Sequence, residues 1–316
     1  MIAVAFGLLC LLLVGPVPDW LSRAQWPMRA PRAAMALWQA IALAAILSAF
    51  SAGLAIAANL LRPDGDAGAT ASIPVQIERL GWPLWLLSVA AFAATVLVGA
   101  RLAFTTVGLA VRTRSRRAAH RRVVDLIATV DEPVVADYHP LRAQYVRRLA
   151  VDRPLAYCLP GRNRRVVVTD GTVARLSDDE LRAVLAHERA HLRARHDLVL
   201  EAFIALQAAF PRFVRSKSAL GSVELLAETL ADDQAVRSTS PTTLARALVA
   251  VSDAGAPEGA LAVGGSMTLA RINRLAAPNS VRVAVAAYAA AAAVLVVPTL
   301  AVAIPWLREL SRLVSG

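Results

Sequence analysis

Three residues near the middle of the chain have the types and the spacing of a zinc hydrolase site. His187, Glu188 and His191 form the sequence H-E-x-x-H. Two histidines four residues apart lie one above the other on one helix face, so both imidazoles can reach one metal ion. The glutamate lies about a quarter-turn round the helix, close enough to touch a water at the ion. We predict that His187 and His191 are metal ligands and that Glu188 is the catalytic base.

The residues before this motif predict the helix that must carry it. Ser177-Asp178-Asp179-Glu180 is a capping box, with serine at the N-cap, glutamate at N3 and acids in the first turn. Apolar residues then recur at helical spacing, at Leu181, Val184, Leu185 and Leu192. The helix is expected to span 178–209 and to end before Pro211. This context favours the metal motif over the alternative of two surface histidines on a charged helix.

A third ligand is expected from an acidic segment further along the chain. Glu228 and Asp232 are one helical turn apart, in the sequence E-x-x-A-D. Glu228 could bind the metal, and Asp232 could accept the other ring N–H of a ligating histidine from behind. Glu224 is the rival ligand, and a solvated acidic helix face is the alternative for the whole segment. Asp197, soon after the motif, is a further candidate for an acid behind a ligand.

The composition indicates a membrane protein. The 316 residues are 57% hydrophobic, and the mean hydropathy of +0.53 is too high for an ordinary soluble domain. Apolar stretches at about 1–17, 33–61, 82–111 and 283–307 are predicted as four transmembrane helices. The first is expected to be a span rather than a cleaved signal peptide, because no basic residue precedes it and it ends at Gly15-Pro16.

Arginines set the predicted orientation and domain organisation. Six of them follow the third span closely, at Arg112, Arg114, Arg116, Arg117, Arg121 and Arg122. The positive-inside rule places this end in the cytoplasm, together with the whole of 112–282, which is the predicted metallopeptidase domain. The segment 308–316 is then a short outer tail. The net charge of +11 is expected to meet anionic lipid headgroups rather than nucleic acid, because no recognition motif accompanies the arginines.

The predicted domain is of mixed α and β structure. A charged helix is expected near 114–130, followed by strands at 155–159 and 165–169 that are joined by a turn at 160–163. We expect 165–169 to be an edge strand that pairs with an extended substrate segment. A helix over 224–237 and a loop over 253–265 follow. The helix near 267–275 is expected either to lie against the membrane or to pack in the core. Cys10 and Cys158 cannot form a disulfide framework, which fits a reducing compartment.

The whole arrangement resembles the BlaR/MecR-type integral membrane zinc metallopeptidases, the sensor-transducers of beta-lactam resistance. The resemblance rests on the order of three spans, protease and fourth span, on Leu176–Leu181 with H-E-x-x-H, on Glu228–Asp232, and on Arg271–Leu275 before the last span. It implies a mainly α membrane protein with a cytoplasmic zincin-like domain of the gluzincin type. It also implies a Zn²⁺ cofactor and a role in antibiotic-resistance signalling through cleavage of a BlaI-like repressor.

Two features leave other functions open. Antibiotic-sensing members carry an outer penicillin-binding domain with an S-x-x-K nucleophile, whereas only a few residues follow the predicted fourth span here and Lys217 is the only lysine. H-E-x-x-H and E-x-x-A-D also occur in CAAX prenyl proteases and HtpX-like enzymes, so a quality-control protease is an alternative. A non-catalytic signalling protein with a structural zinc is another, although structural sites are usually rich in cysteine. Candidate oxyanion donors include His196, Tyr157 and several arginines.

Overall fold

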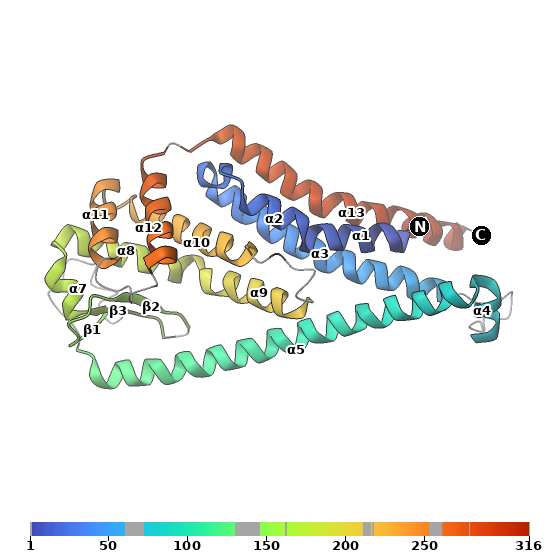
Figure 1. The fold of residues 1–316 in the computed structure, drawn as a ribbon, viewed down its shortest axis with the longest axis horizontal. Coiled ribbons are helices and arrows are strands. Elements are labelled where there is room, and N and C mark those ends of the chain that lie inside the picture. The colour runs from blue at the N-terminus through green and yellow to red at the C-terminus, as the bar shows by residue number, and fades with distance from the viewer. Residues whose placement is uncertain are drawn as a thin grey trace.

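The chain is mostly helical, with a small sheet at one end (Figure 1). The computed structural model describes residues 2–60, 73–129, 146–161, 163–210, 216, 218–252, 261–277 and 279–315. Long apolar helices lie together at one end of the molecule, and the sheet with the shorter helices lies at the other. The elements before the sheet are α1 (Ile2–Val14), α2 (Pro16–Ser22), the 3₁₀ helix η1 (Trp26–Arg29), α3 (Pro31–Leu60), α4 (Ile73–Leu80) and α5 (Trp82–Ile127).

Four of the described helices are long and apolar enough to cross a membrane. They are Ala3–Ser22, Pro31–Ile56, Trp82–Ile127 and Val281–Ala301, and each coincides with a predicted span. The first comprises α1 and α2, which meet at Gly15 and Pro16, where the sequence predicted a helix stop. α3 packs against α1, against α5 and against α13 (Val281–Ser315). The apolar helices therefore form a bundle around α3.

The third apolar helix extends further than the sequence predicted. A separate charged helix near 114–130 was expected, but α5 continues without a break from Trp82 to Ile127. Its 46 residues correspond to a length of about 69 Å at 1.5 Å per residue. The arginine-rich half contains no proline and many good helix formers, so nothing ends the helix at the predicted boundary. Arg117 binds Asp197 and Glu201 of α9 (His196–Ala209) at 2.8 Å each, which fixes this half against the domain.

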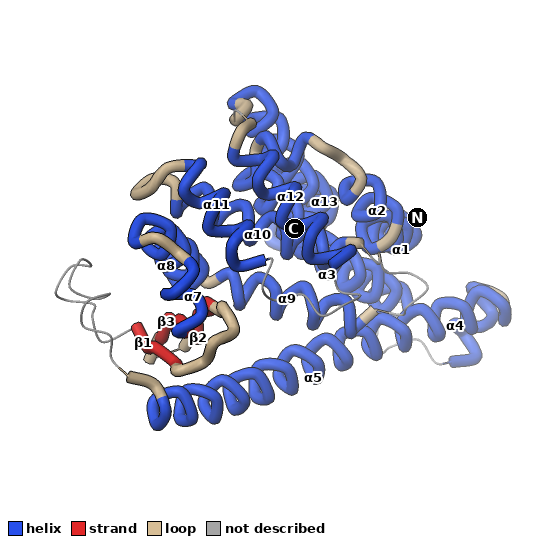
Figure 2. The backbone as a smooth tube through the Cα atoms, turned by 60° about the vertical axis from the view of Figure 1, so that its left-hand side comes forward, coloured by secondary structure: helices blue, strands red, loops and turns tan. Residues whose placement is uncertain are grey.

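The sheet has three strands, β1 (Val146–Leu149), β2 (Ala156–Leu159) and β3 (Arg165–Thr169). Their order is β1-β3-β2, with β1 parallel and β2 antiparallel to β3. The predicted strands β2 and β3 are confirmed, but the expectation that 165–169 lies at an edge is wrong. β3 is central, and its three consecutive valines are almost fully buried, as in strands covered on both faces. The edge next to the metal helix is β2, which contacts α8 (Figure 2).

The metal-motif helix is confirmed in its start and corrected in its end. In α8 (Asp178–Ala194), Ser177 and Glu180 form the predicted capping box. The chain then breaks at Arg195, which adopts a left-handed conformation with φ of 53°, and α9 begins at His196. The break lets the two helices pack on different partners. Leu181, Val184 and Leu185 of α8 lie in the core under the sheet, whereas Phe203 of α9 packs on Trp38 of α3.

The remaining helices complete the domain. Between α8 and the sheet lies the short α7 (Asp170–Arg175), and after α9 come α10 (Ala219–Ala235), α11 (Pro241–Ser252) and α12 (Leu261–Leu275). α10 corresponds to the predicted helix 224–237 but begins earlier. Part of the predicted loop, 253–260, lies outside the described residues, and 261–265 belong to α12 instead. α12 packs on α10 and α11, as the core-packing alternative predicted.

Candidate metal centre

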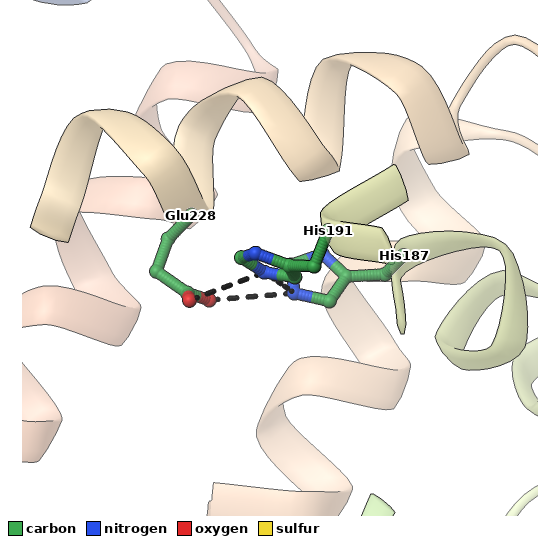
Figure 3. Close-up of side chains that lie close together, drawn as sticks. All are labelled: His187, His191 and Glu228. Atoms are coloured by element: carbon green, nitrogen blue, oxygen red, sulfur yellow. Dashed lines mark hydrogen bonds and ion pairs between the residues drawn. The ribbon is translucent and has the colours of Figure 1, made fainter. Parts of the chain in front are cut away.

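Two histidines from α8 and one carboxylate from α10 converge at one point (Figure 3). The Nε2 atoms of His187 and His191 are 3.1 Å apart. The two carboxylate oxygens of Glu228 lie 3.3 Å from these nitrogens, one oxygen to each. The structure thus brings together the three residues that the sequence predicted as ligands. The rival Glu224, one turn earlier on α10, is not part of this cluster.

The donor set and its spacing fit a zinc ion. Zinc bound at 2.0–2.1 Å in a tetrahedron separates its ligand atoms by about 3.3–3.4 Å, close to the separations seen here. Two imidazoles and one carboxylate are also a known catalytic zinc set, which leaves a fourth position for water or substrate. The residues present therefore suit the ion that the motif predicts.

Asp232 lies directly behind His187, as the sequence predicted. His187 Nδ1–H donates to the Asp232 carboxylate at 2.8 Å, and the Asp232 side chain is 2% exposed. This bond keeps a proton on Nδ1 of His187 and turns Nε2 toward the cluster. Burial alone would lower the pKa of His187, but the hydrogen bonds to Asp232 and Glu228 outweigh it and raise the pKa to about 9.

The second ligand, His191, is held by another histidine. Its Nδ1 lies 3.0 Å from Nδ1 of His196, at the start of α9. Burial, and then the nearby His191, lower the pKa of His196 to about 4, so this ring is neutral at pH 7. His191 can then donate its Nδ1–H to His196 and keep Nε2 as a lone pair for a metal. The sequence named His196 as an oxyanion candidate, and the structure shows that it contacts a ligand instead.

Asp197, the other acid proposed to lie behind a ligand, does not contact one. It binds Arg117 of α5 at 2.8 Å. Tyr157, a further oxyanion candidate, hydrogen-bonds His120 of α5 through its hydroxyl at 2.9 Å. Both residues therefore help to join the long helix to the domain. Neither could be placed from the sequence, because the predicted helix near 114–130 carries no local signal of how it packs against the domain.

Arg271 is the site residue that sequence reasoning missed. Its guanidinium donates to both oxygens of Asp232, at 2.7 and 2.6 Å, and lies 3.0 Å from Glu228. Although burial opposes it, hydrogen bonds from Arg271 and His187 lower the pKa of Asp232. Burial would raise the pKa of Glu228, but hydrogen bonds to His187 and His191 outweigh it and lower the pKa. Arg271 belonged to a helix that was expected either to lie against the membrane or to pack in the core, and its spacing does not reveal that its side chain turns inward.

Glu188 is half-buried beside the cluster and near the edge strand. Burial raises the pKa of Glu188, and the thiol of Cys158 on β2 lies beside its carboxylate. The same burial, together with Glu188, raises the pKa of the Cys158 thiol, which is therefore protonated and can donate. The predicted base thus lies between the histidine pair and β2. Cys158 had been considered only for disulfide formation.

Comparisons with known proteins agree with this chemistry. Residues 117–252 match the model of Peptidase family M48. The chain is also 33% identical over 91 residues to a protease HtpX homolog from Thermoplasma volcanium, over 28% of this chain and 29% of that relative. The alignment thus spans less than a third of the relative's length. No solved structure matches.

The family match corrects the resemblance seen in the sequence. The comparisons support a membrane metallopeptidase of the M48 type and not the BlaR/MecR subtype. The shared motifs explain the difference, because H-E-x-x-H and the later glutamate occur in several groups of membrane peptidases. The segment that matches Peptidase family M48 holds the three converging side chains, Glu188 and Asp232.

Proposed function

We propose that this chain is a zinc-dependent endopeptidase, anchored in a membrane by four helices, with its metal centre on the cytoplasmic side. The observation that carries the proposal is the convergence of His187, His191 and Glu228 beside the half-buried Glu188, within a segment that matches a metallopeptidase family. His187, His191 and Glu228 would hold the ion. Zinc bound there would polarise the scissile carbonyl and lower the pKa of the attacking water from 15.7 to about 7.

Glu188 is proposed as the general base and then the general acid. Its burial raises its pKa above that of an ordinary glutamate, so its carboxylate is a better acceptor for the proton of the attacking water. The same carboxyl group can pass this proton to the leaving amine. The thiol of Cys158 can donate to the carboxylate and so orient it. Asp232 and Arg271 do not contact the reacting atoms in this proposal. Asp232 holds His187 in place, and Arg271 holds Glu228.

β2 is proposed as the strand that binds the substrate. It pairs with β3 along one side only, among the described residues, and it lies against α8. An extended peptide could add to its other side through main-chain hydrogen bonds, which require little sequence preference. Because Cys158 of β2 contacts Glu188, a peptide beside this strand would pass close to the base.

The physiological substrate is proposed at the level of class. The relative found in the comparisons is a protease HtpX homolog, which favours the general membrane-associated protease predicted as the alternative. Cleavage of a BlaI-like repressor rests on the sequence resemblance alone. Proteomic comparison of cleavage fragments in cells that carry the wild type or Glu188→Gln would separate one regulatory substrate from many.

Glu188→Gln also tests the enzymatic proposal itself. The purified full-length variant should keep its zinc, because Glu188 is not a proposed ligand, and should lose peptide cleavage by at least about a hundredfold. Glu224→Gln on α10 is a matched control that removes a carboxylate outside the cluster and should cleave normally. Cleavage by Glu188→Gln at the wild-type rate would refute the mechanism.

A further inference from the structure

A second site is suggested by an arginine-rich hollow on the opposite side of α8 from the metal ligands. The hollow has a volume of about 720 Å³, and five arginines line it, from α5, the β2–β3 turn and the end of α8: Arg114, Arg164, Arg189, Arg193 and Arg195. His187 and His191 face α10, whereas Arg189 and Arg193 lie about half a turn away on the helix. The hollow is therefore separate from the proposed peptidase site.

The positive charge of the arginines in the hollow is not neutralised by acidic residues in its lining. Asp197 is the one acidic residue in its lining, and it is bound by Arg117 at 2.8 Å. Among the described residues, no hydrogen bond or ion pair holds the side chains of Arg114, Arg164, Arg193 or Arg195. Several guanidinium groups around one concavity favour an anion, and their forked N–H groups suit a phosphate in particular.

An exposed apolar stripe on α5 precedes Arg114, the residue of this helix that lines the hollow. Phe104, Val107 and Val111 are 77%, 63% and 56% exposed. With Arg114 they recur at intervals of three, four and three residues, so the four side chains share one face of the helix. A small soluble anion would not contact this apolar stripe, whereas the acyl chain of a lipid could pack along it.

The position of Arg114 along α5 agrees with a lipid headgroup. The proposed third span ends at Val111, and Arg114 follows about 4.5 Å further along the helix axis. The headgroup layer on each side of a bilayer is about 5–7 Å thick, so Arg114 would lie in this layer if the hydrocarbon core ends at Val111. Arg117, through Asp197 and Glu201, holds α9 against α5 and so keeps the two walls of the hollow together.

We propose that this hollow binds an anionic phospholipid, with the phosphate among the arginines and an acyl chain along Phe104, Val107 and Val111. The inference rests on the membrane topology of the proposed function but not on its peptidase chemistry. Bound lipid would fix the arginine-rich half of α5, and with it the β2–β3 turn, at the membrane surface.

The test is a titration of the purified full-length chain in detergent with phosphatidylglycerol and with phosphatidylcholine of the same acyl chains, followed by native mass spectrometry. The wild type should prefer phosphatidylglycerol. Arg114→Gln/Arg193→Gln should weaken its binding by about 30-fold, as expected for two basic residues at a charged surface. Arg116→Gln/Arg175→Gln removes the same charge at two exposed positions that do not line the hollow, and should bind like the wild type.

A further variant separates lipid from free phosphate. Val107→Asn should weaken phosphatidylglycerol binding while competition by inorganic phosphate stays unchanged. The proposal is overturned if both lipids bind equally, if the control pair weakens binding as much as the hollow pair, or if glycerol phosphate binds as tightly as the lipid. Displacement of the lipid by an acidic peptide at equal concentration would also overturn it, in favour of a peptide site. Zinc content, measured on the same samples, reports on the peptidase proposal separately.

Discussion

At the scale of single residues, the candidate site is a continuous set of polar contacts. His187 binds Asp232, and Arg271 binds both Asp232 and Glu228. The convergence of His187 and His191 could be predicted from the sequence because their spacing along one helix fixes which face they share. Arg271 could not, because its contact depends on how α12 packs against α10, and the local sequence does not encode that.

The carboxylate of Asp232 should control metal affinity. Asp232→Asn keeps the shape of the side chain but removes its negative charge. His187 Nδ1–H and the Arg271 guanidinium both donate to this carboxylate. Zinc affinity should fall by about 10–100-fold, as for other groups that hold a ligating histidine. Competition with a zinc chelator measures this. Asp233→Asn removes the neighbouring carboxylate, which binds Arg274, and should leave the affinity unchanged. Equal losses in the two variants would contradict the role given to Asp232.

Arg271 should matter most when the metal is removed. Arg271→Met leaves the carboxylates of Glu228 and Asp232 without a guanidinium, which for a buried pair costs about 3–5 kcal/mol. Zinc supplies positive charge at the same place, so added zinc should restore more stability to this variant than to the wild type. Thermal unfolding with and without zinc measures the difference. Arg274→Met, which removes the partner of Asp233, should lower stability equally in both conditions.

At the scale of elements, predictions succeeded where the chain carries a local start or stop. The capping box at Ser177 starts α8, and the predicted turn joins β2 to β3. The break at Arg195 was missed because neither glycine nor proline marks it. It exists because α8 and α9 pack against different cores, the sheet and the apolar bundle. The continuous α5 was missed because a helix boundary was expected where the sequence changes from apolar to arginine-rich. A change of polarity does not by itself end a helix.

The joint between α5 and the sheet should weaken in acid. Asp125, near the end of α5, accepts hydrogen bonds from Arg165 of β3 and Arg147 of β1, and the bond from Arg165 holds its pKa below the ordinary value. A lowered pKa means that the stabilisation is full at neutral pH and is lost as the pH falls through the folded-state pKa. Asp125→Asn should cost less than about 1 kcal/mol at pH 7, because the pair is exposed.

Unfolding curves of the wild type and Asp125→Asn over a range of pH check this. The two proteins should differ at pH 7 and converge in acid, and the difference should shrink at high salt. A difference that grows as the pH falls would show that Asp125 acts in some other way.

At the scale of the whole molecule, composition located the apolar helices but could not identify the family subtype. The four candidate spans agree with the structure because length and hydropathy are properties of each helix alone. The subtype depended on motifs and a span order that other membrane peptidases share, so the sequence could not decide between the branches. Which helices pack side by side could not be predicted, since the apolar segments have no distinguishing pattern.

The proposed topology predicts opposite accessibility for two positions. In a background without Cys10 and Cys158, Ser115→Cys in the arginine-rich half of α5 should resist a membrane-impermeant maleimide in intact cells and react after permeabilisation. Glu78→Cys in α4 should react in intact cells, because α4 precedes the third span and so lies on the side opposite the arginine-rich half of α5. The reverse pattern would invert the topology and place the metal centre outside the cytoplasm.

The zinc content of purified full-length protein tests the three-ligand centre most directly. Elemental analysis should find about one zinc per chain in the wild type, in Glu188→Gln and in Glu224→Gln, and a large loss in Glu228→Gln, because the Glu228 carboxylate is the group that meets both imidazoles. A wild type without bound metal, or Glu228→Gln with full zinc while Glu224→Gln has lost it, would contradict the account.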